Sequence, residues 1–158
     1  MQTFKKIHWV LTPLLLVLGT SLFLPAQEAK KIYAQKLVDD TLAKHKEVVV
    51  MAMHVTPPGK TENIIIASNI GRIGKKADED DMRVIETGKP NLEVNKKGDR
   101  FEVELVLQDQ SGKTIGAVGI VFPYEKGQEA EFQKKAEEIR DEMKQKTLTL
   151  AKLFETVD

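Results

Sequence analysis

The sequence of 158 residues contains no cysteine. This absence excludes disulfide bonds, thiol nucleophiles, and zinc or iron–sulfur sites that depend on cysteine ligands. It also excludes a lipid attached through an N-terminal cysteine. An excess of positive charge is missing too, because 24 Lys and Arg balance 24 Asp and Glu, whereas proteins that bind nucleic acid present a basic face. The length suits one domain, and we expect that this domain does not bind nucleic acid.

Tryptophan is almost absent, and the single one, Trp9, lies in an N-terminal segment unlike the rest of the chain. Two lysines precede a mostly apolar run over residues 7–24, and Ala26 offers a small residue for signal peptidase. This is the pattern of a secretory signal, so residues 1–26 are predicted to be a signal peptide. The alternative is an uncleaved anchor, because the run approaches the length of a bilayer span. Residues 27–158 are therefore predicted to be periplasmic or secreted, or membrane-anchored if the segment is retained.

The remaining chain carries alternating helix and strand patterns. Helices are indicated by apolar residues at three- and four-residue steps, and strands by β-branched runs or strict alternation. Asp78 can cap a short helix that Gly88 closes. The predicted elements are a helix over 27–46, strands over 48–55 and 63–68, a short helix over 78–87, strands over 92–95, 101–108 and 114–122, and a helix over 129–146.

These elements predict an α+β fold. The links within each group of strands are too short for crossovers, which favours a five-stranded antiparallel sheet. We expect long N- and C-terminal helices on one face of that sheet. The short helix, which lies between strands two and three, is expected to cover the other face.

Local sequence agrees with a known family. Ala-Ser-Asn at 67–69 and Arg-Ile-Gly-Lys at 72–75 follow the second strand, Thr-Gly-Lys-Pro at 87–90 ends the short helix, and a glycine-rich hairpin covers 109–120. In this order they resemble the single Cache domain, an extracellular PAS-like sensor module, over roughly residues 30–146. The resemblance implies an extracytoplasmic site for a carboxylate, amino acid or similar metabolite, between the sheet and the segment after strand two.

The chain departs from this family in two respects. It lacks the tyrosine, arginine and tryptophan signature of the members that bind amino acids. It also lacks the usual second membrane helix and cytoplasmic output domain. We therefore expect a sensor subunit or carrier for a small organic acid or similar metabolite, working with a membrane-bound sensor or transporter protein.

Five residues are candidates for ligand binding. Arg72, Arg83 and Arg100 can each hold a carboxylate in a planar, two-pronged geometry. Arg83 lies on the short helix expected to roof the pocket, and Arg72 lies in the loop that leads there. Ser68 and Asn69 end the second strand at the same place and could supply neutral hydrogen bonds. The alternative is that the arginines are ordinary solvated surface residues.

Other clusters point less clearly to chemistry. His45 and His54 could lie near one sheet edge, but a metal site needs further ligands. The acidic run at 78–81 lacks the spacing of a calcium loop and suits the first turn of a helix. Glu102 and Glu104 share a strand face and could form an acid–base pair, although alternating acids on a solvated face are the commoner cause of this pattern. No cluster combines a nucleophile, a base and an orienting group, so we predict no catalytic site, metal or cofactor.

A ligand-free interaction protein is the second functional hypothesis. In that case the pocket would be filled by large side chains. The candidates for this filling are Met51, Met53, Ile64, Ile66 and Phe101. The terminal helices would then dock a partner or a second copy, and a homodimer through these helices is part of the prediction.

Overall fold

The computed structural model describes residues 30–157, so the predicted signal segment over 1–26 lies outside the described residues. The fold is α+β, and its sheet is antiparallel and five-stranded, as predicted. The elements in chain order are β1 (Lys31–Ile32), α1 (Tyr33–Lys44), β2 (Val50–Val55), β3 (Ile64–Ser68), α2 (Glu79–Thr87), β4 (Asn91–Val94), β5 (Arg100–Gln108), β6 (Thr114–Pro123), α3 (Glu129–Lys146), the 3-10 turn η1 (Ala151–Phe154) and β7 (Thr156–Val157).

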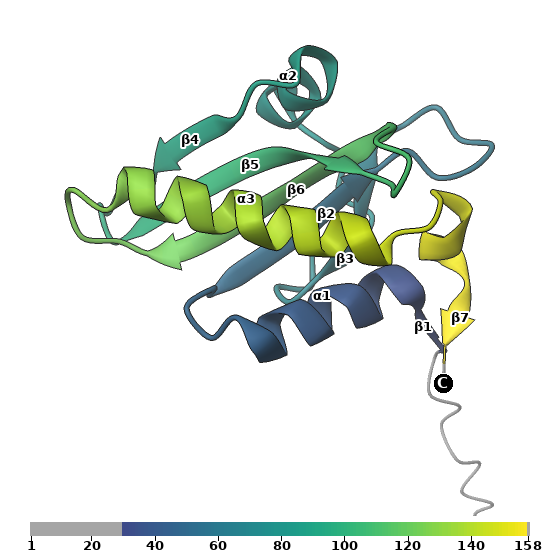
Figure 1. Cartoon of the computed structure of the whole chain (residues 1–158). Helices are drawn as coiled ribbons and strands as arrows, with labels where there is room; N and C mark the ends of the chain where they lie inside the picture. The colour runs from purple at the N-terminus through teal and green to yellow at the C-terminus, as the bar shows by residue number, and fades with distance from the viewer. Residues whose placement is uncertain (1–29, 158) are drawn as a thin grey trace, which may run out of the picture.

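The strands of the sheet lie in the order β3-β2-β6-β5-β4 (Figure 1). Two hairpins, β2–β3 and β5–β6, join where β2 pairs with β6. Strand β4 follows α2 and forms one edge of the sheet, where it pairs with β5. The two strands at the centre, β2 and β6, therefore come from different hairpins.

The N-terminal helix is shorter than predicted. It covers Tyr33–Lys44 rather than the whole of 27–46, and residues 27–29 lie outside the described part. Lys31 and Ile32 instead pair with Val157 and Thr156 at the other end of the chain. Helical spacing along the sequence cannot show such a pairing, because the partner strand is distant in the chain. The C-terminal helix covers Glu129–Lys146, the predicted range.

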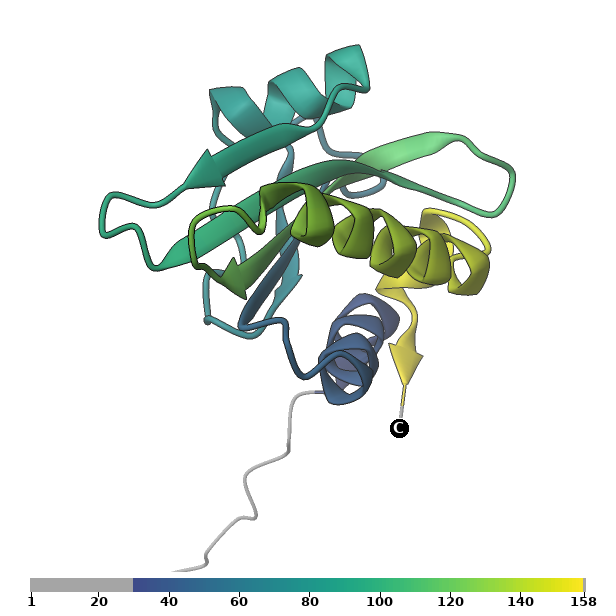
Figure 2. The ribbon, with the colours of Figure 1, turned by 60° about the vertical axis from the view of Figure 1, so that its left-hand side comes forward.

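One face of the sheet, here called the helical face, is covered by α1 and α3 (Figure 2). Every second residue of the long strands points into this layer, as the two-residue period of a strand requires. Phe122 of β6 is fully buried there and stacks on Phe132 of α3, with ring centroids 4.6 Å apart. The apolar stripe of α3, formed by Ala136, Ile139 and Met143, is also fully buried in this core.

Helix α2 lies over the opposite face, above the sheet in Figure 1 while α1 lies below it. The Asp78 side chain caps this helix by accepting from the amides of Asp80 and Asp81, as expected for its N-terminal position. The Asp81 side chain in turn accepts a hydrogen bond from the amide of Asp78, and these reciprocal bonds form a capping box. Over residues 30–157 no helix is both long enough and apolar enough to cross a membrane.

Candidate functional site

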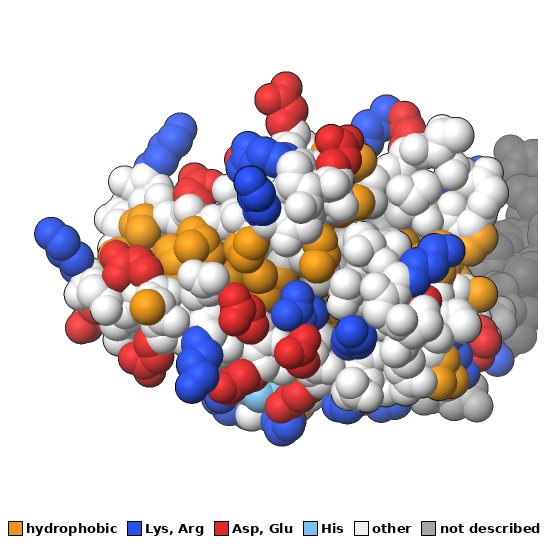
Figure 3. All heavy atoms as spheres, turned by 45° about the horizontal axis from the view of Figure 1, so that its top comes forward, with side chains coloured by type: hydrophobic (Ala, Val, Ile, Leu, Met, Phe, Trp, Pro, Cys, Tyr) orange, Lys and Arg blue, Asp and Glu red, His pale blue; other side chains and the backbone are white. Residues whose placement is uncertain are grey.

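The face of the sheet beneath α2, here called the cleft face, is hollowed by a cleft of about 340 Å³. Small residues form its floor, since Ala52 of β2 pairs with Gly119 of β6. Figure 3 shows the side of the molecule that carries α2, where acidic and basic side chains surround a hydrophobic band. The cleft is lined by Val50, Ala52, His54, Ile65, Ile70, Arg72, Lys75, Asp78, Asp81, Glu93, Asn95, Arg100, Glu102, Gly119 and Val121.

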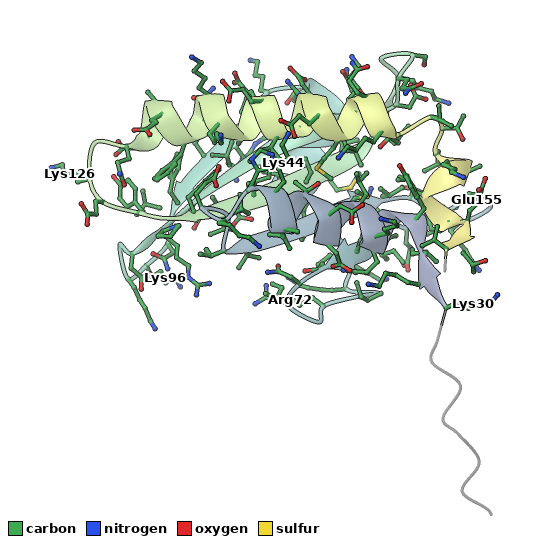
Figure 4. All side chains as sticks on the ribbon, turned by 60° about the horizontal axis from the view of Figure 1, so that its bottom comes forward. Lys30, Lys44, Arg72, Lys96, Lys126 and Glu155 are labelled. Atoms are coloured by element: carbon green, nitrogen blue, oxygen red, sulfur yellow. The ribbon has the colours of Figure 1, made fainter. Side chains whose placement is uncertain are left out.

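Two of the five predicted ligand-binding residues, Arg72 and Arg100, line the cleft together with Lys75. Arg72 lies in the loop between β3 and α2, where Figure 4 labels it, and Arg100 begins β5. Within residues 30–157, none of these three cations forms an ion pair with a carboxylate. All three side chains are exposed, so their positive charge faces the open cleft.

The other three predicted residues do not line the cleft. Asn69 supports the sheet edge, because its side chain accepts from the Met51 amide and donates to the Val49 carbonyl, both at 3.0 Å. Ser68 is buried, and its hydroxyl accepts from the amide of Ile70. Their short-range polar contacts are therefore to the backbone.

Arg83 lies on the exposed side of α2. Its guanidinium forms an ion pair with Asp80 at 2.7 Å and donates to the Asn91 side chain at 2.9 Å. The helix does roof part of the cleft, as expected, through Asp78 and Asp81. Arg83 sits on a different side of the same helix, a distinction that depends on how α2 is rotated about its axis.

Acidic side chains share the cleft with these cations. Glu93 and Glu102 are neighbours on β4 and β5, because they are paired across the two strands. The cleft walls limit the water around Glu102, and the charges of Glu93 and Asp81 add to this effect, so the pKa of Glu102 is raised. The cleft therefore offers both positive and negative groups to a ligand.

A buried polar cluster, formed by His54, Asp81 and Glu104, adjoins the cleft. The exposed fractions of these residues are only 8%, 7% and 4%. Nδ1 of His54 lies 3.1 Å from Oδ2 of Asp81, but the atoms are not aligned as a hydrogen bond. Oε1 of Glu104 has no hydrogen-bond partner among the described residues. The cluster thus contains two buried polar atoms, Nδ1 of His54 and Oε1 of Glu104, without a hydrogen-bond partner among the described residues.

The two carboxyl groups of this cluster titrate differently. Burial raises the pKa of Glu104, and the neighbouring charge of Asp81 raises it further. Burial alone would also raise the pKa of Asp81, but contacts with His54, Glu104 and the backbone outweigh burial and hold it below its usual range. These opposite shifts favour Asp81 as the charged member of the pair and Glu104 as the member that holds a proton.

Two sequence-based interpretations are corrected by this arrangement. Glu104 does not belong to a solvated face, because α2 covers it. His45 and His54 do not share a sheet edge, since Nε2 of His45 contacts Glu142 of α3 at 3.0 Å on the helical face. Alternation along β5 did place Glu102 and Glu104 away from the apolar core. The sequence pattern did not predict the packing of α2, which brings Asp81 close to His54 of β2 and Glu104 of β5.

The side chains proposed to fill the pocket lie elsewhere. Met51, Met53, Ile66 and Phe101 are buried in the core under α1 and α3, and Ile64 packs against the same core. None of these residues lines the cleft. The five side chains that were expected to fill the pocket therefore belong to the helical face of the sheet, not to the cleft face.

Comparisons with known proteins identify the fold. No protein-family model and no curated protein sequence matches this chain. The GAF domain of nlh2 from A. aeolicus has a TM-score of 0.56 at 13% identity, covering 73% of this chain and 85% of that one. The repressor BlcR of Agobacterium tumefaciens has a TM-score of 0.51 at 11% identity, covering 76% of this chain and 66% of the repressor. This chain thus spans just under two thirds of the repressor, and it has a GAF/PAS-like fold.

Proposed function

We propose that this protein is an extracytoplasmic sensor domain of the Cache type, which binds a small organic anion in the cleft beneath α2. The observation that carries the proposal is the group of three cleft cations, Arg72, Lys75 and Arg100, which have no ion-pair partner within residues 30–157. The GAF/PAS-like fold supports it, because small-molecule sensor domains use this fold. We propose a binding function rather than catalysis.

The dimensions and charges of the cleft indicate the class of ligand. A volume of about 340 Å³ falls at the small end of ligand pockets, which suits a metabolite of a few carbons. Its carboxylate is expected beside Arg72 and Arg100, where two-pronged hydrogen bonding is available. Glu93 and Glu102 would repel a second negative group, so hydroxyl or amino groups are expected on that side of the ligand.

The sequence supports the proposed location and mode of action. The signal pattern over residues 1–26 favours export, and the resemblance to Cache domains favours sensing outside the cytoplasm. We propose that the protein acts as a sensor subunit or carrier. Its partner would then be a membrane-bound sensor or transporter protein.

Arginine substitutions test the proposed site. The full-length chain is screened by thermal shift against small mono- and dicarboxylic acids, and affinities for any stabilising acid are measured by calorimetry. Replacing Arg100 by Ala, or Arg72 by Ala, should weaken binding roughly 10- to 100-fold, the loss expected for a charge-assisted hydrogen bond. Arg83→Ala is the matched control, because Arg83 pairs with Asp80 outside the cleft, and its affinity should not change.

Two results would contradict this assignment. If Arg83→Ala weakened binding as much as Arg100→Ala, the cleft would not be the binding site. If no acid stabilised the wild-type chain and native mass spectrometry of protein isolated without refolding showed no bound small molecule, the ligand-free interaction protein would be favoured instead.

A further inference from the structure

The strongest unassigned feature is the buried cluster of His54, Asp81 and Glu104. Each residue presents one potential metal-ligating atom, and these atoms all lie within 4.8 Å of one another. They come from three separate elements, β2, α2 and β5. One imidazole nitrogen and two carboxylate oxygens from separate parts of the chain therefore lie close together.

We propose that His54, Asp81 and Glu104 form a binding site for a divalent transition-metal ion. This inference goes beyond the proposed binding of an organic anion, because it uses different residues and does not depend on Arg72 or Arg100. Two of the three ligands, His54 and Asp81, also line the cleft. A bound metal ion would thus lie at the wall of the cleft and be reached through it.

The lack of a lysine or arginine counter-charge among the described residues supports the proposal. Buried carboxylates are normally paired with a cation or coordinate a metal. Within residues 30–157, neither Asp81 nor Glu104 forms an ion pair with a lysine or arginine. Oε1 of Glu104 and Nδ1 of His54 are both buried without a hydrogen-bond partner. A divalent cation would satisfy both atoms and neutralise the buried negative charge.

The backbone around the cluster holds the ligands in place. A register shift interrupts the pairing of β2 with β3 between Met53 and His54, and such bulges re-aim side chains next to functional sites. Asp81 is oriented by the capping box, where its Oδ2 accepts from the Asp78 amide at 2.8 Å. This contact is the kind of supporting hydrogen bond that orients a metal-bound carboxylate.

The sheet leaves room for the two strand ligands to meet. His54 and Glu104 lie on strands that flank β6, where their respective cross-strand partners are Ala117 and Gly119. Ala117 has only a methyl group and Gly119 has no side chain. The longer side chains of His54 and Glu104 can therefore reach across β6 toward each other. Larger residues at these two places would separate the ligands.

The donor atoms indicate the class of metal. Imidazole favours zinc, iron, copper and nickel over magnesium and calcium, and the carboxylates are compatible with zinc and iron. Two ligands of a tetrahedral zinc ion at about 2.1 Å stand roughly 3.4 Å apart. The 3.1 Å between Nδ1 of His54 and Oδ2 of Asp81 is close to this separation. Zinc is therefore the probe of choice, with cobalt as its spectroscopic substitute.

The test measures zinc binding to the full-length chain after removal of any metal with a chelator. Wild-type protein should bind one equivalent of Zn²⁺ in calorimetry, and Co²⁺ should produce visible absorption bands of a nitrogen- and oxygen-ligated ion. Glu104→Gln keeps the shape of the side chain and should weaken zinc binding by at least about tenfold, the minimum effect of losing even a supporting group. Glu86→Gln is the matched control, since it makes the same change at an exposed position of α2 outside both the cluster and the cleft.

Each outcome decides the question. Zinc binding by the wild type and Glu86→Gln, but not by Glu104→Gln or His54→Gln, supports the site. An equal loss in Glu86→Gln, or no zinc or cobalt binding by folded wild-type protein, overturns it and leaves a proton shared between Asp81 and Glu104 in place of a metal ion. If Glu104→Gln does not fold, the cobalt spectrum of the wild type decides alone. Arg100→Ala should retain zinc binding, so a failure of the anion proposal is distinguished from a failure of this one.

Discussion

The two faces of the central sheet are built from alternate residues of the same strands, yet they differ in chemistry. On the helical face the strand residues are apolar, and ten of them are no more than 2% exposed: Met51, Met53, Val55, Phe101, Val103, Leu105, Leu107, Val118, Ile120 and Phe122. On the cleft face the same strands present small, acidic and imidazole side chains, namely Ala52, His54, Glu102, Glu104 and Gly119.

The difference follows from what covers each face. Two helices, α1 and α3, seal the helical face, so that only apolar side chains fit there without an unsatisfied polar group. The cleft face is roofed by α2, a helix of nine residues, which covers only part of it. Polar groups can therefore remain at the cleft, some of them solvated and some buried. The apolar core thus lies on one face of the sheet and the candidate site on the other.

The largest expected effect comes from deleting a ring on the helical face. Phe122→Ala should lower the free energy of unfolding by about 3–5 kcal/mol, because it leaves a cavity beside Phe132. Val121→Ala, its neighbour on the cleft face, should cost only about 1–2 kcal/mol. Urea denaturation followed by circular dichroism measures both. Equal losses would mean that the two faces contribute alike to stability.

An intermediate effect is expected from adding a methyl group to β6. In Gly116→Ala the new Cβ would lie 2.0 Å from the carbonyl oxygen of His54, so the backbone must shift, which should cost about 1–3 kcal/mol. In Gly119→Ala the nearest atom is Oε1 of Glu102 at 2.9 Å, at the end of a flexible side chain. We expect this variant to stay within about 1 kcal/mol of wild type in thermal denaturation. A larger loss in Gly119→Ala would show that the cleft floor is rigidly packed.

The smallest effect concerns acid sensitivity on the helical side. Lys44, and then His45, lower the pKa of Glu142 to about 2. The carboxylate therefore stabilises the fold above its unfolded pKa of about 4.3, and this contribution disappears as the pH falls toward 2. Since Glu142 is 37% exposed, we expect less than about 1 kcal/mol.

Urea midpoints at several pH values check this expectation. The difference between wild type and Glu142→Gln should be constant above pH about 4.5 and shrink below it. Glu138→Gln, an exposed position on the same helix, serves as the control. A difference that stays constant down to pH 2 would show that the contacts of Glu142 contribute nothing as ion pairs.

Local patterns were sufficient for most of the fold. The alternation in β5, the apolar stripe of α3 and the cap at Asp78 each depend on residues within a few positions of one another, and these elements formed where they were predicted. The pairing of β1 with β7 was missed, because it joins Lys31 and Ile32 to Thr156 and Val157, which are far apart in the sequence. Patterns of neighbouring residues contain no information about such distant contacts.

The candidate site was less predictable for the same reason. Arg72 and Arg100 were proposed from the chemistry of arginine and do line the cleft, but Arg83, chosen by the same reasoning, lies outside it. The rotation of α2 decides which of its side chains face the sheet. That rotation results from packing against β5 and β6, which the helical sequence alone does not specify.

The sequence by itself determined the order of the elements, the α+β class and which strand residues are apolar, because these follow from the periods of helices and strands along the chain. Only the tertiary structure decided that His54, Asp81 and Glu104 meet. Their convergence requires a helix from one part of the chain to cross two strands from others, and that arrangement depends on long-range packing rather than on any local period.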